Sequence, residues 1–179
     1  KGVAAYTDMH VWDGQSNGSI DFSAADCGMP ALGHMIENRV MRDALVTACE
    51  AHPRITTRWP CQLKAVIQTD QQIALDTDSD TIVAQLLVGA DGARSWVREQ
   101  AGFELKENAY GHTALVATVV SEKPHQKTAM QCFLPTGPLA FLPLEGAHTA
   151  SIVWSMEETL AAEISGLDDA AFLSRLSQA

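Results

Sequence analysis

The sequence lacks several features that would place it in a large class of proteins. Its 179 residues contain no apolar run near the roughly 18 residues that a membrane-spanning helix needs. Lys and Arg number 12 against 22 Asp and Glu, a formal net charge of −10, which is too acidic for a nucleic-acid-binding surface. No Cys-x-x-Cys pair occurs among the four cysteines, so a zinc site is disfavoured and reduced thiols are favoured. We therefore expect no nucleic-acid partner and no metal.

The sequence also shows neither a signal peptide nor an initiator methionine. It opens Lys1-Gly2-Val3 and meets polar residues from Tyr6 onward, unlike the apolar segment of a secretory signal. We therefore expect a cytoplasmic location, and we expect that Lys1 is not the natural first residue. Apolar residues make up 46% and charged residues 19%, which indicates a globular chain with a core.

Hydrophobic periodicity and turn signals predict a mixed α/β pattern of the α+β class. Two alternating segments separated by Asp13-Gly14 and Asn17-Gly18 predict a hairpin. Apolar residues at helical spacing follow Asn38, which we expect to cap a helix that ends before Pro53. Further strands are predicted at 55–59, 63–69, 73–75, 82–88, 112–121, 130–134, 139–144 and 149–155, and helices at 95–101 and 157–179.

The most informative segment is Leu86–Arg98, an apolar run followed by a glycine-rich turn with one carboxylate, Asp91, and then a helix start. Gly89 and Gly92 permit positive φ or a close approach of the backbone to another group. Amides at the start of the helix can face an anion such as a pyrophosphate. A plain strand–turn–helix junction is the alternative for the turn taken alone, since Asp-Gly is a common turn dipeptide. The Gly-x-Gly-x-x-Gly fingerprint is absent from the chain.

This segment resembles the Asp-Gly motif of FAD-dependent aromatic hydroxylases. Other stretches resemble, in order, the ubiquinone-biosynthesis hydroxylases of the UbiH/UbiF/VisC type, with the 2-octaprenylphenol hydroxylase branch the most similar. They are Met9–Asp13, Leu32–Asn38, Ala114–Thr118, Ala140–Leu144 and Ser151–Ser155. The resemblance therefore covers nearly the whole chain.

The resemblance implies chemistry that cofactors carry out. NAD(P)H reduces FAD, oxygen adds to the reduced flavin, and the flavin hydroperoxide hydroxylates an activated phenol ring. No catalytic residue of the protein is implied. Cofactor contacts are implied for Asp91, Gly92, Arg94, Ser95 and Arg98.

The resemblance also implies where the substrate binds. Phe141, Leu142, Leu144 and Trp154 are expected on a substrate-binding sheet, with ordinary core packing as the alternative for each. In related hydroxybenzoate hydroxylases this strand supplies a cation for the substrate carboxylate, whereas Ala140–Leu144 contains no Arg, Lys or His. Because an unpaired buried carboxylate is costly, we expect a lipidic phenol such as a polyprenylated phenol rather than an aromatic acid.

Three parts are expected from this resemblance. They are a hairpin of the substrate sheet at 1–25, a partial FAD-binding domain at 26–105, and the substrate-binding sheet with its following helices at 106–179. The family's opening glycine fingerprint and its later Gly-Asp motif are absent. We therefore expect an internal fragment that is inactive alone and binds FAD weakly or not at all.

Two other functions stay open at this point. One is a flavin-dependent oxidoreductase that shares the Asp-Gly motif without hydroxylating, and the other is a non-catalytic interaction module of a biosynthetic assembly. The oligomeric state is open as well, and so is peripheral association with a membrane or a biosynthetic complex.

Overall fold

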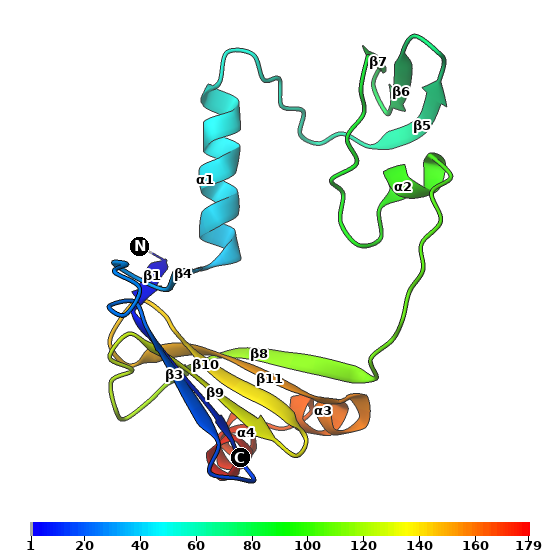
Figure 1. Cartoon of the computed structure of the whole chain (residues 1–179). Helices are drawn as coiled ribbons and strands as arrows, with labels where there is room; N and C mark the ends of the chain where they lie inside the picture. The colour runs from blue at the N-terminus through cyan, green and yellow to red at the C-terminus, as the bar shows by residue number, and fades with distance from the viewer. Residues whose placement is uncertain (1) are drawn as a thin grey trace. The chain divides into compact units, whose positions relative to one another are not determined.

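The computed structural model describes residues 2–179 and shows the mixed α/β fold that the sequence predicts (Figure 1). The chain divides into two units. The first, which we call the sheet unit, consists of the residues up to Val46 together with Ala109–Ala179. The second, the motif unit, is Thr47–Asn108 and contains the Asp-Gly segment. The sequence-based division placed its boundaries at residues 25 and 105 instead.

The sheet unit is built on a six-stranded sheet with the strand order β3-β2-β9-β10-β11-β8. The predicted hairpin is present, and Asp13 N–H donates to the Gly18 carbonyl across the turn that joins β2 and β3. All neighbours pair antiparallel except β2 and β9, which run parallel. The strands are β2 (Asp8–Asp13), β3 (Ser19–Ser23), β8 (His112–Val120), β9 (Thr128–Leu134), β10 (Gly137–Pro143) and β11 (Thr149–Glu157).

Two helices, α3 (Glu158–Ser165) and α4 (Asp169–Gln178), cover one face of this sheet (Figure 1). Every second residue of β11 from Ala150 to Met156 is buried, as expected for a strand with one covered face. The sequence predicted one helix here, but the chain breaks it at 166–168. Asp168 then caps α4 as predicted, because its Oδ1 accepts a hydrogen bond of 2.8 Å from Ala171 N–H.

A separate two-stranded ribbon leads into the first helix. Its strands are β1 (Val3–Tyr6) and β4 (Gly33–Ile36), which pair antiparallel. The helix is α1 (Asn38–Ala51), so Asn38 is its first residue rather than the cap that the sequence predicted. The Glu37 carbonyl accepts the first helical bond, from Met41 N–H at 3.1 Å.

The motif unit contains a three-stranded antiparallel sheet and one short helix. These are β5 (Leu63–Gln68), β6 (Ile73–Thr77), β7 (Thr81–Ala84) and α2 (Trp96–Gln100). The prediction of a strand at 55–59 is wrong, because the structure has no strand there. The segment lies between Pro53 and Pro60, and neither proline has a backbone N–H to donate to a neighbouring strand. The predicted strand at 82–88 ends early at Ala84, and Leu86 and Val88 are 74% and 73% exposed. Beyond Ala84 this apolar run pairs with no neighbouring strand among the described residues. Its side chains therefore gain no burial that would stabilise an extended strand.

Candidate functional site

The segment from Gly89 to Arg98 forms a tight loop into α2, and two glycines make this loop possible. A Cβ atom on Gly89 would lie 2.9 Å from Val97 Cγ1, so only glycine allows the loop to approach the helix this closely. Gly92 has a φ of +91°, which residues with side chains rarely adopt. A Cβ atom on Gly92 would meet nothing within 4 Å, so a ligand can approach this turn without displacing protein atoms.

Asp91 closes this loop with both carboxylate oxygens. Ser95 Oγ donates a short hydrogen bond to Oδ1, and Val97 N–H donates to Oδ2 at 3.1 Å. The Ser95 hydroxyl, and after it the Val97 amide, hold the pKa of Asp91 below its usual value because they stabilise the charged form. The ionised carboxylate therefore holds the turn against the start of α2.

Ser95 links the carboxylate to the helix. It is buried, it is the N-cap residue of α2, and its Oγ accepts a hydrogen bond of 3.0 Å from Arg98 N–H. The sequence predicted that the first amides of the helix can face an anion, and the Val97 amide faces one from its own loop, the Asp91 carboxylate. The Val97 amide donates to the Asp91 carboxylate, and the Arg98 amide donates to the Ser95 hydroxyl. A bound anion would therefore contact other groups of the loop.

Two arginines supply positive charge beside this loop. Arg98 Nη1 donates to the Ala93 carbonyl at 2.9 Å, which anchors its guanidinium at the turn. Arg94 is exposed and follows Gly92 by two residues. An anion that approaches Gly92 would meet a backbone without a side chain and two nearby cations, which suits phosphate oxygens.

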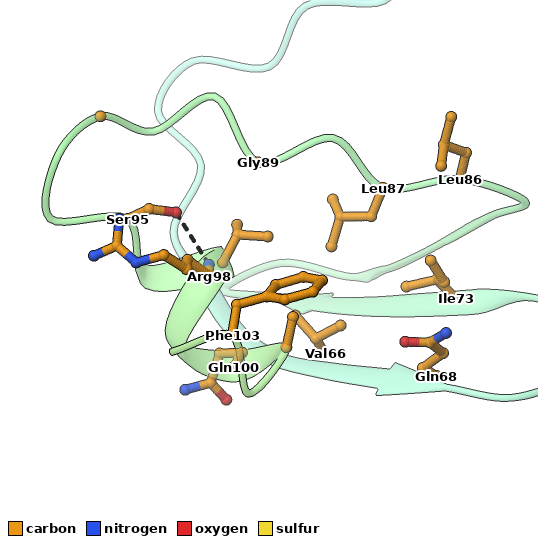
Figure 2. A pocket seen from close by; sticks show the side chains of 13 residues that line it. Val66, Gln68, Ile73, Leu86, Leu87, Gly89, Ser95, Arg98, Gln100 and Phe103 are labelled. Carbon is orange, nitrogen blue, oxygen red and sulfur yellow. Dashed lines mark hydrogen bonds between the residues drawn. The ribbon is translucent and has the colours of Figure 1, made fainter. Parts of the chain in front are cut away.

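A cavity of about 610 Å³ adjoins the loop (Figure 2). Its apolar wall includes Val66, Leu87 and Phe103, which face one another in Figure 2, while Ser95 and Arg98 lie at one end. This combination of an apolar wall and a polar end can receive a group that is part aromatic and part charged.

The residues predicted to bind substrate do not share one location. Trp154 and Phe141 lie on the helix-covered face, where Trp154 packs edge-to-face on Phe172 with ring centroids 6.5 Å apart. Leu142 is next to Phe141 on β10 and therefore points to the opposite face. Leu144 follows the end of that strand, and its N–H donates to the Thr149 carbonyl at 2.9 Å.

The face of the sheet opposite α3 and α4, which we call the open face, carries apolar side chains of which the sequence had singled out only Leu142. Val116 and Val120 of β8 are 68% and 78% exposed, while Leu115, Ala117 and Val119 of the same strand turn toward the core. The nearly continuous apolar run at 114–120 was the signal that could have identified them, because such a strand presents apolar side chains on both faces. Cross-strand register places further apolar residues on the same face, namely Ile20, Phe22, Met9, Phe133, Ala140, Leu142 and Val153.

Two further kinds of site are absent from residues 2–179. No helix there combines the length and apolar character that crossing a membrane requires. No group of three or more His, Cys, Asp or Glu side chains in the same range is placed to hold a metal ion.

The sequence profile of the FAD binding domain family matches residues 3–176, nearly the whole chain. The chain belongs to this family. It is 39% identical over 154 residues to the ubiquinone hydroxylase UbiL of Rhodospirillum rubrum, covering 86% of this chain and 35% of that protein. It is 37% identical over 150 residues to the 3-demethoxyubiquinol 3-hydroxylase of Escherichia coli, covering 83% and 38%. The resemblance to ubiquinone-biosynthesis FAD hydroxylases is thereby confirmed.

A human relative extends the match along the chain. The mitochondrial ubiquinone biosynthesis monooxygenase COQ6 of Homo sapiens is 33% identical over 186 residues, which cover 98% of this chain and 39% of that protein. The chain thus spans less than half the length of each of these curated relatives.

Solved structures show the same fold. PqsL, a probable FAD-dependent monooxygenase from Pseudomonas aeruginosa, matches with a TM-score of 0.73 at 19% identity, covering 91% of this chain and 46% of that one. HpxO of Klebsiella pneumoniae, in complex with FAD and uric acid, matches with a TM-score of 0.67 at 14% identity, covering 90% and 44%. At these identities the likeness concerns the fold alone.

Proposed function

We propose that this chain is part of a FAD-dependent aromatic hydroxylase that uses NAD(P)H and O2 to hydroxylate a polyprenylated phenol in ubiquinone biosynthesis. One observation carries the proposal. The FAD binding domain profile spans residues 3–176, and relatives named for ubiquinone hydroxylation match 83–98% of the chain.

The loop from Gly89 to Arg98 fits a role in holding FAD, which when bound supplies the redox and oxygen chemistry. The Gly92 turn would receive pyrophosphate oxygens, and Arg94 and Arg98 would neutralise their charge. Asp91 and Ser95 would hold the turn in shape, since their hydrogen bonds are made within the loop. The chain's own contribution is thus binding and orientation rather than proton transfer.

The substrate side of the proposal is supported by the open face. It carries exposed apolar side chains such as Val116 and Phe133, and the strand 140–144 has no charged side chain. A substrate carboxylate would find no partner on this strand, whereas a prenyl chain would gain roughly 25 cal/mol for each Å² of apolar surface that it buries. We therefore assign the open face, with Leu142 and the adjacent Leu144, to a lipidic phenol. Trp154 and Phe141 would support it from the core.

A lipidic substrate favours a particular location of the protein in the cell. A polyprenylated phenol resides in membranes, so we place the protein in the cytoplasm with peripheral association to a membrane or to a biosynthetic complex. NAD(P)H is the proposed electron donor.

The decisive experiment uses a longer protein that contains this chain. We expect it to purify with FAD and to consume NAD(P)H in step with the hydroxylation of a short-chain prenylated phenol. In the Arg98→Gln variant FAD should bind about tenfold more weakly, the usual scale for a lost charge-assisted hydrogen bond. The matched control is Arg54→Gln, an exposed arginine of the same unit outside the loop, which should bind FAD normally.

Three outcomes would contradict the proposal in different ways. NAD(P)H consumption that produces only peroxide would favour another flavin-dependent oxidoreductase. Absence of FAD from the longer protein would favour the interaction module. Faster hydroxylation of hydroxybenzoate than of the prenylated phenol would overturn the substrate assignment alone. For the 179-residue chain by itself we expect weak FAD binding or none.

A further inference from the structure

A histidine far from the Asp-Gly loop in sequence joins two loops of the sheet unit. His125 lies between β8 and β9, and its backbone N–H donates to the Ala147 carbonyl at 2.8 Å in the loop between β10 and β11. Its carbonyl accepts from Thr128 N–H at 2.8 Å. Both ring nitrogens are also bonded, so four hydrogen bonds converge on this one residue.

These bonds determine the protonation state of the His125 ring. Nε2 lies 2.7 Å from the Gly146 carbonyl oxygen, which can only accept, so Nε2 must carry the proton. Nδ1 accepts a hydrogen bond of 3.0 Å from Lys127 N–H, so Nδ1 must be unprotonated. The geometry therefore requires the neutral ring in a single tautomer.

The residues that His125 holds are in an unusual backbone conformation. Gln126 and Lys127 have φ values of +50° and +59°, and they are the only non-glycine residues among 2–179 with positive φ. Each such residue costs about 1 kcal/mol or more and persists only where its surroundings hold it. The bond from Lys127 N–H to the His125 ring is part of that restraint.

This strained turn in turn positions the start of the sheet. The Lys127 carbonyl accepts from Thr7 N–H at 2.9 Å and from Asp8 N–H at 3.4 Å. Thr7 is the single residue between β1 and β2, so the turn holds the junction of the β1–β4 ribbon with the six-stranded sheet. The same turn, β1 and residues 144–147 line a cavity of about 480 Å³.

We propose that His125 is a proton-sensitive latch that holds the β1–β2 junction and the adjoining cavity in their present form. When a proton from solvent adds to Nδ1, Lys127 N–H loses its acceptor and two donors face each other. The turn at 126–127 then loses the hydrogen bond from Lys127 N–H to the His125 ring. As the turn loosens, the Lys127 carbonyl no longer accepts the hydrogen bonds from Thr7 N–H and Asp8 N–H. Acidification should therefore loosen the β1–β4 ribbon and open the cavity before the rest of the sheet unit changes.

The charged groups around the latch come from three segments. Glu122, Lys123 and Lys127 belong to its own loop, and Glu145 lies across the cavity, where its Oε2 accepts from Gly2 N–H at 2.7 Å. Asp8 at the start of β2 is adjacent to the junction itself. Acids and bases are thus mixed here, and the response depends on the geometry of the ring bonds rather than on charge of one sign.

Two other histidines of the sheet unit serve as internal comparisons. His148 Nδ1 lies 2.9 Å from the Ser121 carbonyl oxygen, so this nitrogen donates in the neutral and in the protonated ring alike. His10 Nδ1 lies 2.6 Å from Asp21 Oδ1, a pair that protonation strengthens. Of these three rings, only that of His125 makes a bond that protonation must break.

The test uses nuclear magnetic resonance on the 179-residue chain. Ring nitrogen shifts at pH 7.5 should show that His125 carries its proton on Nε2. When the pH is lowered from 7.5 to 5.5, the hydrogen-exchange protection factors of the Thr7 and Lys127 amides should fall. We expect a fall of about fivefold, the equilibrium equivalent of one ordinary hydrogen bond, with no change at Ile152 in the core.

Variants separate the latch from a general effect of acid. His125→Gln keeps a side chain that can donate to Gly146 but cannot titrate, so protection at Thr7 should no longer depend on pH. His148→Gln should leave the pH response as it is in the unaltered chain. Protection factors at Thr7 and Lys127 that stay equal at both pH values, or a proton found on Nδ1, would overturn the proposal even if a variant failed to fold.

Discussion

The sheet unit and the motif unit differ most in how much apolar surface each one buries. Ile152, Met156 and Ile164 of the sheet unit are fully enclosed between the six-stranded sheet and its helices. Within the described residues 47–108, Leu75 is the only buried hydrophobic residue, while Trp59 and Phe103 stay largely exposed. Since apolar burial is the main favourable term in folding, the sheet unit has the means to be stable by itself.

The motif unit relies on polar contacts instead. The Asp91–Ser95 network shapes its loop, and Arg58 pairs with Asp80 at the turn between β6 and β7. Such contacts determine geometry well but contribute little net free energy where water reaches them. The difference teaches that the unit with the clearest sequence motif is also the unit that buries the least apolar surface among its own residues.

The largest expected effect is a truncation in the core of the sheet unit. Ile152→Ala removes a fully buried side chain and should lower the free energy of unfolding of that unit by about 2–5 kcal/mol. Urea denaturation followed by circular dichroism measures this loss. Val116→Ala on the open face is the control and should cost less than about 1 kcal/mol. Equal losses for the two variants would contradict the assignment of the covered and open faces.

A smaller effect is expected from the cap of α2. Ser95→Ala removes the acceptor for Arg98 N–H and the donor to Asp91, so the loop should lose about 1 kcal/mol of local stability. Hydrogen exchange at the Arg98 amide measures this, and the core amides of the sheet unit should not respond. Asp168→Ala is the matched change at the cap of α4. If Arg98 exchanged at the same rate with and without the Ser95 hydroxyl, the proposed network would be wrong.

The loop should also depend on pH through Asp91. Its pKa is lowered in the folded state, chiefly by Ser95, so its contribution is complete above the unfolded value of 3.8 and is lost as pH falls through the lower folded value. The Val97 amide shift should therefore stay constant from neutral pH to about pH 4 and move only in stronger acid. Asp91→Asn should abolish that movement. A transition near pH 6 would point to another group.

The smallest expected effect is the loss of the exposed ion pair in the motif unit. Arg58 Nη1 lies 2.7 Å from Asp80 Oδ1, but both side chains are substantially exposed. Arg58→Ala should therefore change stability by less than about 1 kcal/mol, and added salt should shrink the difference further. Thermal unfolding at low and high salt checks this. A loss of several kcal/mol would mean that polar contacts stabilise the motif unit far more than we infer.

Local signals predicted much of the sheet unit correctly. The Asp13-Gly14 and Asn17-Gly18 turns, the strand from His112 and the cap at Asp168 each depend on residues a few positions apart. The pairing of β1 with β4 and the parallel pairing of β2 with β9 were not predicted. These pairings join residues about 30 and 120 positions apart, and no local pattern records which strands will become neighbours.

The candidate site divides in the same way. The glycines of the Asp-Gly loop could be read from the sequence, because positive φ and close approach are properties of single residues. The sequence could not show that Asp91 and Ser95 would occupy the first amides of α2. Nor could it show that Trp154 would turn to the helices while Leu142 turned away, because an apolar residue on a strand suits either face until a partner covers one of them.

The sequence by itself therefore determined the mixed α/β class, the family and the loop that a cofactor would contact. Turn residues, helical and strand periodicity and the order of motifs all depend on residues that are close together in the chain. Only the tertiary structure decided which apolar residues form the core and which form the open face. It alone brought His125 to Gly146 and Lys127 to Thr7. These contacts depend on how strands distant in the chain are packed side by side, and packing is a property of the assembled fold.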